Sequence, residues 1–344
     1  MRLLICTQAV DLDNPVLGFF HGWIAELASR FDEIVVICLY EGRHALPKNV
    51  RVYSLGKEKG AVSATRYALR FLGLVLKHRT EYDTVFVHMN QEYVLLGGIF
   101  WKFWGKHIYL WRNHYSGTFL TDIAATFCKK IFYTSKHSYT AKYHNARQMP
   151  IGIDLSLFKP AVTGARISNS VLSLGRISPS KRLEVFLDAL KILSAHGLSY
   201  SADVYGDALP ADGAYLSGLK DQVRDSRLEA QITFHLGIPN AQTPAVYASH
   251  EIFVNMSGGG MYDKTIFEAA ACGCLVLASS PDFSEWAGKE LTFESNAESL
   301  ATRLQAVLSA SLAERSDMQA RLVRGAEKNS LKAFSSALSS ELER

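Results

Sequence analysis

Two groups of residues in the second half of the chain have types and spacings that suit a diphosphate. The first is Gly175-Arg176, which follows an apolar run, with Lys181 five residues later. Arginine binds phosphate through two parallel hydrogen bonds, whereas lysine acts as a point charge. Glycine at the end of a strand permits backbone conformations that other residues rarely adopt. The spacing therefore predicts two cations at the mouth of a helix, although an ordinary turn with solvated charges has the same composition.

The second group is a glycine-rich run that leads into a helix. The glycines 258–260 follow a strand that ends near Asn255, and a helix begins within Asp263–Thr265. Exposed backbone amides at a helix N-terminus bind anions without any special side chain. Glu268 lies one turn into this helix, where it could accept hydrogen bonds from a ribose diol. The alternative is a flexible loop followed by a solvated helical glutamate.

Short β-rich runs alternate with helical patterns along the chain, which predicts parallel sheets covered by helices on both faces. A polar stretch containing Pro150, Gly152 and Pro160 interrupts the alternation. We therefore predict an α/β fold of two Rossmann-like domains, residues 1–160 and 161–324, with a final helix at 325–344 that packs back on the first domain. Ligands bind at the carboxyl ends of such strands. The predicted strands are Leu3–Thr7, Ile34–Leu39, Val50–Leu55, Thr84–His88, Ile108–Trp111, Lys130–Thr134, Val171–Leu174, Ser201–Tyr205, Ile232–Leu236, Ile252–Asn255 and Leu275–Ala278.

Composition narrows the class of protein. The chain has 344 residues, of which 48% are hydrophobic and 20% charged, and its formal net charge is +4. This charge is mild, and no nucleic-acid partner is expected. Five cysteines without metal-type spacing indicate a reduced, cytoplasmic protein. The longest apolar stretch, Tyr93–Phe103, is too short to span a bilayer, which needs about 20 residues.

Three segments, in this order, resemble family 4 of the glycosyltransferases, whose members have the GT-B fold and retain the anomeric configuration. Pro150-Ile-Gly-Ile-Asp154 is similar to the family's hinge, and Gly175-Arg176 with Lys181 is similar to its diphosphate clamp. The segment from Glu268 to Val276 is similar to the family's "EA-A-x-G-x-P-V" pattern. The resemblance covers nearly the whole chain and is specific only in combination.

This resemblance implies a metal-independent hexosyltransferase that uses a UDP-, GDP- or ADP-sugar and needs no cofactor. The implied catalytic residues are His114, Arg176 and Lys181. The implied donor-binding residues are Gly18, Gly175, Gly206, Ile238, Gly260, Met261, Tyr262, Asp263, Lys264, Thr265 and Glu268.

The sequence departs from the family at one important position. The first Glu of the family's Glu-x7-Glu pair, which lies near the donor sugar, is replaced by Gly260. Backbone amides of residues 260–262 would then face the sugar, with Asp263 or Lys264 assisting. Because of this departure, a non-catalytic nucleotide-sugar sensor is an alternative function. A GT-B epimerase and a sugar phosphorylase are further alternatives within catalysis. A dinucleotide oxidoreductase is disfavoured because no G-x-G-x-x-G follows the first strand.

The acceptor side of the chain combines basic and apolar residues. Tyr67–Arg79 and Trp101–Lys106 both mix cations with large apolar side chains, a combination that can seat a protein on an anionic membrane. The alternative is an amphipathic helix whose apolar face is core. The membrane interpretation implies a peripheral protein on the inner face of the cytoplasmic membrane. Its acceptor, a saccharide or a lipid-linked sugar, would belong to polysaccharide, lipopolysaccharide or glycolipid assembly.

Overall fold

The computed structural model describes residues 1–14, 16–60, 62–160, 166–260 and 262–343. The chain forms two compact units, of which the first joins Met1–Gly152 to Leu331–Arg344 and the second is Ile153–Ser330. The boundaries expected near residues 160 and 324 therefore fall inside the second unit. The two chain segments next to these boundaries pair with each other inside the second unit: the amide of Ile153 donates to the carbonyl of Asn329 at 2.9 Å.

The first unit is built on a seven-stranded sheet, ordered β3-β2-β1-β4-β5-β6-β7, in which every neighbouring pair is parallel. Six of these strands overlap the predicted apolar runs. The seventh, β7, is a short edge strand with the polar sequence Ala-Arg-Gln, and no hydrophobic pattern indicated it. The strands are β1 (Arg2–Val10), β2 (Glu33–Glu41), β3 (Val50–Ser54), β4 (Thr84–His88), β5 (His107–Trp111), β6 (Lys130–Tyr133) and β7 (Ala146–Gln148).

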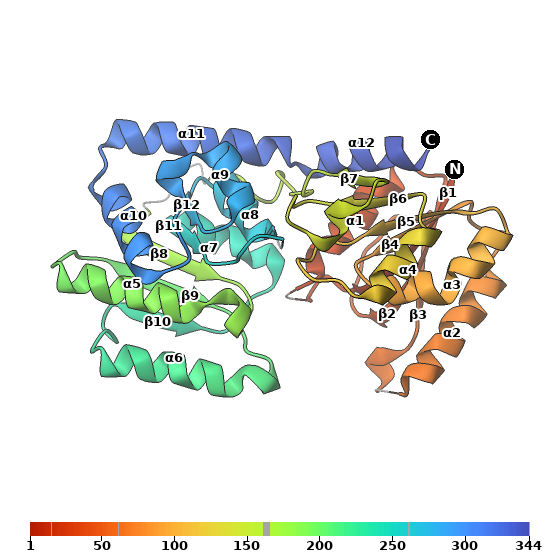
Figure 1. Cartoon of the computed structure of the whole chain (residues 1–344), viewed down its shortest axis with the longest axis horizontal. Helices are drawn as coiled ribbons and strands as arrows, with labels where there is room; N and C mark the ends of the chain where they lie inside the picture. Colours follow the sequence, from red (N-terminus) through yellow and green to blue (C-terminus); the bar gives the residue numbers. More distant parts are fainter. Residues whose placement is uncertain (15, 61, 161–165, 261, 344) are drawn as a thin grey trace. The chain divides into compact units, whose positions relative to one another are not determined.

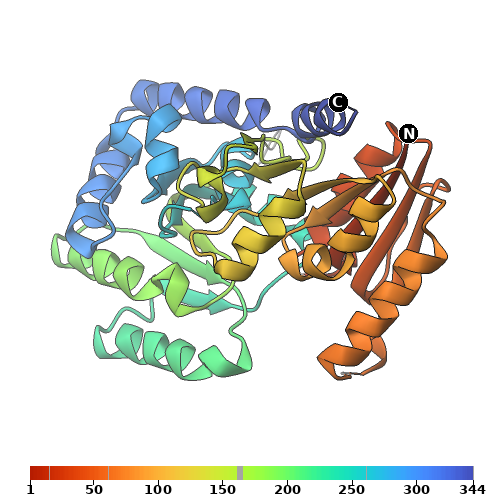
Figure 2. The same ribbon diagram turned by 45° about the vertical axis from the view of Figure 1, so that its right-hand side comes forward.

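Helices cover both faces of this sheet. α1 (Gly18–Ala28) packs with α12 (Leu331–Leu342), the last helix of the chain, on one face (Figure 1). The ring centroids of Trp23 and Phe334 are 3.8 Å apart, and Phe334 also packs edge-on against Trp111. The opposite face is covered by α2 (Ala64–Lys77), α3 (Gln91–Phe103) and α4 (Phe119–Phe127), of which α2 and α3 are orange in Figure 2.

The indole of Trp101 is part of the core beneath α3. It is fully buried and donates from Nε1 to the hydroxyl of Tyr82 at 3.0 Å. Trp101 therefore cannot contact a membrane, which corrects its part in the membrane-facing interpretation of Trp101–Lys106. The exposed apolar side chains of α3 are instead Ile99, Phe100 and Phe103.

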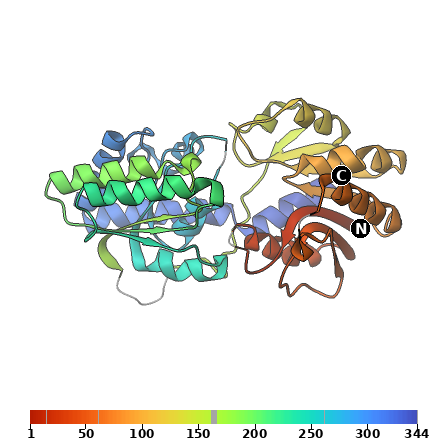
Figure 3. The same ribbon diagram turned by 90° about the horizontal axis from the view of Figure 1, so that it is seen from below.

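The second unit is built on a five-stranded parallel sheet, ordered β10-β9-β8-β11-β12. Figure 3 shows α5 and α6 together on one face and α7 on the other. The strands are β8 (Ile167–Leu174), β9 (Ser201–Tyr205), β10 (Ile232–His235), β11 (His250–Asn255) and β12 (Leu275–Ala278). The helices are α5 (Leu183–Ala195), α6 (Gly213–Asp225), α7 (Thr243–Ser249), α8 (Lys264–Ala271), α9 (Pro281–Ala287), α10 (Ala297–Ser309) and α11 (Leu312–Lys328).

Strand order in the second unit reverses between β8 and β11. Such a switch point leaves a crevice outside the carboxyl ends of the two strands, since their following helices go to opposite faces. The turn after β8 is held tightly: Gly175 has φ +150°, and a Cβ on Gly206 would lie 1.9 Å from the Gly175 carbonyl oxygen. The two glycines therefore let the ends of β8 and β9 approach closely. The predicted fold class, two parallel α/β sheets, is confirmed.

Candidate functional site

Lys181 lies at the switch point of the second unit. It ends a single 3₁₀ turn, Pro179–Lys181, that follows β8. Its Nζ donates to Oδ2 of Asp263 at 2.5 Å and to Oγ of Ser257 at 3.0 Å, so residues that follow β8 and β11 meet here. The structure therefore brings together the two groups of residues that the sequence singled out.

Asp263 is the centre of this cluster. It occupies the N-cap position of α8, and its Oδ2 also accepts hydrogen bonds from Ser257 Oγ at 2.5 Å and Asn255 Nδ2 at 3.0 Å. Burial would raise the pKa of the Asp263 carboxyl. The charge of Lys181 and the hydrogen bonds outweigh burial, so the pKa is lowered. The carboxyl is therefore ionised at neutral pH and holds Lys181 as an ion pair.

Arg176 is the second predicted cation, and its side chain is exposed just past Gly175. Within the described part of the chain, no ion pair involves it. A guanidinium at a strand end that is not committed to a carboxylate can bind a phosphate group bidentately. Arg176 and Lys181 thus differ, because only Lys181 must leave a carboxylate before it can bind an anion.

Glu268 is buried in the middle of α8, with 4% of its surface exposed. Its Oε1 accepts from Asn240 Nδ2 at 3.3 Å, and its Oε2 accepts from the Tyr247 hydroxyl at 3.4 Å. Burial raises the pKa of Glu268, although the nearby Lys264 ammonium opposes the rise. Burial likewise lowers the pKa of Lys264, opposed by the charge of Glu268. These long hydrogen bonds can be exchanged for shorter ones to a polar ligand, such as a ribose diol.

The loop between β11 and α8 contains the other donor-binding candidates. Gly260 is buried with φ +86°, a conformation that favours glycine, and Met261 lies outside the described residues. The Tyr262 side chain packs on Phe267, and its hydroxyl accepts a hydrogen bond from the Trp286 indole. Only the backbone of Tyr262 could therefore contact a ligand. The Thr265 hydroxyl accepts from Asn255 at 3.4 Å, inside the same cluster as Asp263.

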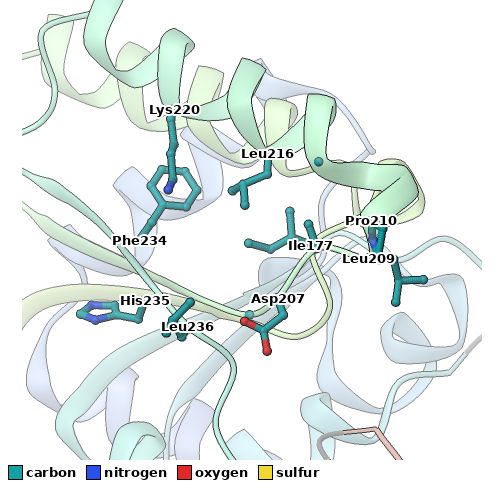
Figure 4. A pocket seen from close by; sticks show the side chains of 12 residues that line it. Ile177, Asp207, Leu209, Pro210, Leu216, Lys220, Phe234, His235 and Leu236 are labelled. Atoms are coloured by element: carbon teal, nitrogen blue, oxygen red, sulfur yellow. The ribbon is translucent and has the colours of Figure 1, made fainter.

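A pocket of about 420 Å³ opens at the carboxyl ends of β9 and β10 (Figure 4). Gly206 lines it, as do Leu216 and Phe234, which contribute apolar surface. Asp207 is at its edge and accepts from the Gly237 amide at 3.0 Å. Ile238 follows that turn, just beyond the lining residues of β10. The pocket can hold a flat, largely apolar group such as a nucleobase.

The remaining two predicted residues, Gly18 and His114, belong to the first unit. Gly18 is the first residue of α1, and a Cβ there would lie 3.0 Å from the Leu12 carbonyl oxygen. His114 follows β5, and its Nδ1 accepts a hydrogen bond from the Ser116 amide at 3.0 Å. The Ser116 hydroxyl and carbonyl oxygens also lie 2.9 Å and 3.2 Å from this nitrogen. Ser116 can therefore partner Nδ1 in either tautomer of the imidazole.

Four polar residues of the site were not predicted as binding residues: Asn240, Tyr247, Asn255 and Ser257. Asn255 and Ser257 could have been inferred, because polar residues at the carboxyl end of a buried strand mark such sites. Asn240 and Tyr247 gave no comparable signal, since their position next to Glu268 depends on how α7 packs against α8. The candidate site is therefore more polar than the sequence suggested.

Arg176, Lys181, the amino end of α8, the buried Glu268 and the apolar pocket all follow strands at one edge of the second sheet. We refer to the strand ends of β8 and β11 with Lys181, Asp263 and Glu268 as the crevice. This arrangement suits a ligand that combines a diphosphate with a polyol and a flat ring. The class of protein that the fold defines is an α/β protein of two parallel-sheet units.

Comparison with known proteins specifies this class. The sequence model of a family described as "Glycosyl transferases group 1" matches residues 165–328, nearly the whole second unit. No curated protein matches the chain by sequence.

Solved glycosyltransferase structures share the fold over the full length. HepE from Anabaena, in complex with UDP and glucose, has a TM-score of 0.79 at 17% identity, covering 100% of this chain and 99% of that one. A glycosyltransferase from Rickettsia africae has a TM-score of 0.73 at 14% identity, with coverages of 100% and 99%. Sucrose-phosphate synthase from Thermosynechococcus elongatus has a TM-score of 0.72 at 15% identity, with coverages of 99% and 98%. The chain therefore has the GT-B fold.

Proposed function

We propose that this chain is a retaining glycosyltransferase that moves a hexosyl group from a nucleoside-diphosphate sugar to a saccharide or lipid-linked acceptor. The observation that carries the proposal is the meeting of Lys181 with the amino end of α8 at the switch point of the second unit. The match of this unit to the glycosyltransferase sequence model supports it. HepE, the neighbour bound to UDP and glucose, supports a nucleotide-sugar ligand.

In this mechanism the chain stabilises the leaving nucleoside diphosphate. Arg176 binds a phosphate bidentately, Lys181 exchanges its carboxylate partner for a phosphate oxygen, and the amides at the start of α8 donate to the same group. The bond between the anomeric carbon and the phosphate oxygen breaks, and the acceptor oxygen attacks from the same face. The acceptor proton passes to the departing phosphate, so no protein base is required.

The other candidates have supporting roles in the proposal. Glu268 holds the ribose hydroxyls, and the base lies near Gly206 and Ile238. His114 contacts the donor sugar through Nε2, and the turn at Gly18 contributes backbone to the diphosphate. No metal takes part, so chelation with EDTA leaves turnover unchanged.

The test begins with a panel of UDP-, GDP- and ADP-sugars, each with and without membrane lipid extract, in which released nucleoside diphosphate is measured. Arg176→Ala and Lys181→Ala should each lower turnover by about 10²–10³-fold, the usual cost of removing one group that stabilises developing charge. Lys191→Ala and Arg224→Ala, both exposed in the same unit, are the matched controls. Wild-type turnover in either site variant refutes the donor-site assignment.

The panel also separates the alternatives. Binding of a sugar nucleotide without release under any condition favours the non-catalytic sensor that Gly260 suggested. Conversion of one sugar nucleotide into its epimer, without an acceptor, favours the epimerase. The anomeric configuration of the product, read by NMR, tests retention directly, and an inverted product contradicts it.

We also propose that the acceptor is reached at an anionic membrane face. The outer surfaces of α2 and α3 expose Leu69, Ile99 and Phe103, the last at 86%. Lys77 and Lys102 are exposed on the same two helices. Apolar side chains flanked by cations bind to anionic lipid headgroups. Within the described residues, no helix has the length and apolarity needed to cross a bilayer.

Vesicle flotation tests the membrane contact. Wild-type protein should bind vesicles that contain phosphatidylglycerol and stay unbound with phosphatidylcholine alone. Phe103→Ser should weaken the binding roughly 10- to 150-fold, because a buried aromatic side chain supplies about 1.5–3 kcal/mol. Leu312→Ser, at an equally exposed residue of the second unit, is the matched control. Equal binding of both variants would place the membrane contact elsewhere or remove it.

A further inference from the structure

Asp263 differs from Glu268, the other acidic residue of the crevice, in how hydrogen bonds are distributed over its two carboxylate oxygens. Within the described part of the chain, the hydrogen bonds to its side chain all end on Oδ2, from Lys181, Ser257 and Asn255. The side chain keeps 19% of its surface exposed. Oδ1 is therefore the oxygen that can accept a hydrogen bond from a ligand.

Both oxygens of Glu268 already accept a hydrogen bond. It accepts on Oε1 from Asn240 and on Oε2 from Tyr247, and only 4% of its surface is exposed. Gly260, three residues before Asp263, contributes no side chain at all. Of these two acids, Asp263 is thus the one with an oxygen that accepts no hydrogen bond from the described residues.

A carboxylate is an unfavourable neighbour for a diphosphate, because like charges within a few ångströms repel. Its position next to Lys181 therefore needs another explanation than anion binding. Hydroxyl groups are the donors that a carboxylate binds well, through charge-assisted hydrogen bonds of about 2.5–2.7 Å. The ligand that combines a diphosphate with hydroxyl groups directly beside it is a sugar nucleotide, whose sugar adjoins the second phosphate.

We propose that Asp263 is the sugar-recognising acid of this site. Oδ2 positions Lys181 for the diphosphate, and Oδ1 accepts a hydrogen bond from a hydroxyl of the donor sugar. The inference rests on the proposed glycosyltransferase function and adds to it the residue that distinguishes a sugar nucleotide from its nucleoside diphosphate. It also gives the loop a carboxylate despite the glycine at residue 260.

The test compares two ligands on one variant. Asp263→Asn keeps the size of the side chain and a carbonyl oxygen for Lys181, but replaces the carboxylate. Calorimetry with UDP-glucose and UDP, or with the pair that the donor panel identifies, gives both dissociation constants. For the variant, we expect affinity for the sugar nucleotide to fall roughly tenfold or more, the value of a lost charged hydrogen bond. Affinity for the nucleoside diphosphate should stay equal or increase, since Lys181 loses its competing charge.

Two further variants sharpen the result. Ser257→Ala removes a donor from Oδ2 and a contact of Lys181, so it should change the affinity for both ligands by the same factor. Asp221→Asn, exposed on α6, makes the same chemical change away from the crevice and should alter neither.

Each other outcome is decisive. Equal losses for both ligands in Asp263→Asn would reduce Asp263 to a positioning residue for Lys181 and overturn its role at the sugar. Wild-type values for both ligands would overturn the whole inference. A wild-type protein that binds neither ligand from any pair of the panel would contradict the proposed function instead.

Discussion

Replacing Gly206 by alanine should disrupt the packing between the ends of β8 and β9, which position the candidate site. The added Cβ would lie 1.9 Å from the backbone oxygen of Gly175, where ordinary contact begins near 3.4 Å. Neither atom belongs to a flexible side chain, so the ends of β8 and β9 must separate. Two hydrogen bonds hold these ends together, from the Gly175 amide to Tyr205 and from the Ile177 amide to Asp207, both at 3.0 Å.

The cost follows from these contacts. Overpacking typically costs about 1–3 kcal/mol, and the loss of the two hydrogen bonds adds about 1 kcal/mol each, so we expect a loss of roughly 3–5 kcal/mol in the free energy of unfolding. For a unit of this size that lowers the melting temperature by roughly 6–20 °C. Because Arg176 follows Gly175 directly, its guanidinium should also move. A displacement near 1 Å lowers turnover about 100-fold.

Thermal unfolding followed by circular dichroism, together with nucleoside diphosphate release, measures both effects. Gly218→Ala is the matched control: it lies on exposed α6, and a Cβ there meets no atom within 4 Å. That variant should gain about 0.5–1 kcal/mol, since glycine is unfavourable inside a helix. Equal melting temperatures and equal turnover in the two variants would refute the close packing of β8 against β9.

Three further changes have expected outcomes. Phe334→Ala removes a fully buried ring that packs on Trp23 and should cost about 3–5 kcal/mol in urea unfolding. Tyr82→Phe deletes the hydroxyl that accepts from the buried Trp101 indole and should cost about 1–3 kcal/mol in the same measurement. The pKa of Asp263 is lowered on folding from its ordinary value of 3.8, so its stabilisation is complete above that pH and is lost as the pH falls through the folded value. Urea unfolding of wild type should therefore weaken more steeply in acid than that of Asp263→Asn, and parallel curves would contradict the shift.

Most of the fold could be predicted from the sequence, for a physical reason. Strands of a parallel sheet are covered on both faces, so they read as nearly continuous apolar runs. Thr84–His88 and Leu275–Ala278 are such runs, and the structure has strands with these bounds. Strand β7 lies at the sheet edge with a polar sequence, and nothing in its composition separates it from a loop. Trp101 was predicted on the surface but is buried, because a large side chain next to lysines in the sequence can face either the core or the solvent.

The location of the site was predictable, but its internal pairing was not. Strand ends converge wherever a parallel sheet reverses its order, so Lys181 and the loop before α8 were expected to meet. The ion pair of Lys181 with Asp263 joins residues 82 positions apart. Its geometry depends on the rotation of the 3₁₀ turn after β8 and on the N-cap conformation of Asp263. The contacts of Glu268 with Asn240 and Tyr247 depend on the packing of α7, which no local pattern specifies.

The two acids of α8 show how one short helix can separate two tasks. Asp263 precedes its first turn, where the amide dipoles and the Lys181 ammonium favour the charged carboxylate and lower its pKa. Glu268 lies one turn further, where burial dominates and raises the pKa. A fixed charge with one open oxygen suits recognition of hydroxyls beside the diphosphate. Glu268 is buried and accepts two long hydrogen bonds, so it can become well paired when a ligand replaces their donors. If the proposed function holds, Asp263 is therefore organised before a donor binds, whereas Glu268 becomes well paired only in the presence of the donor.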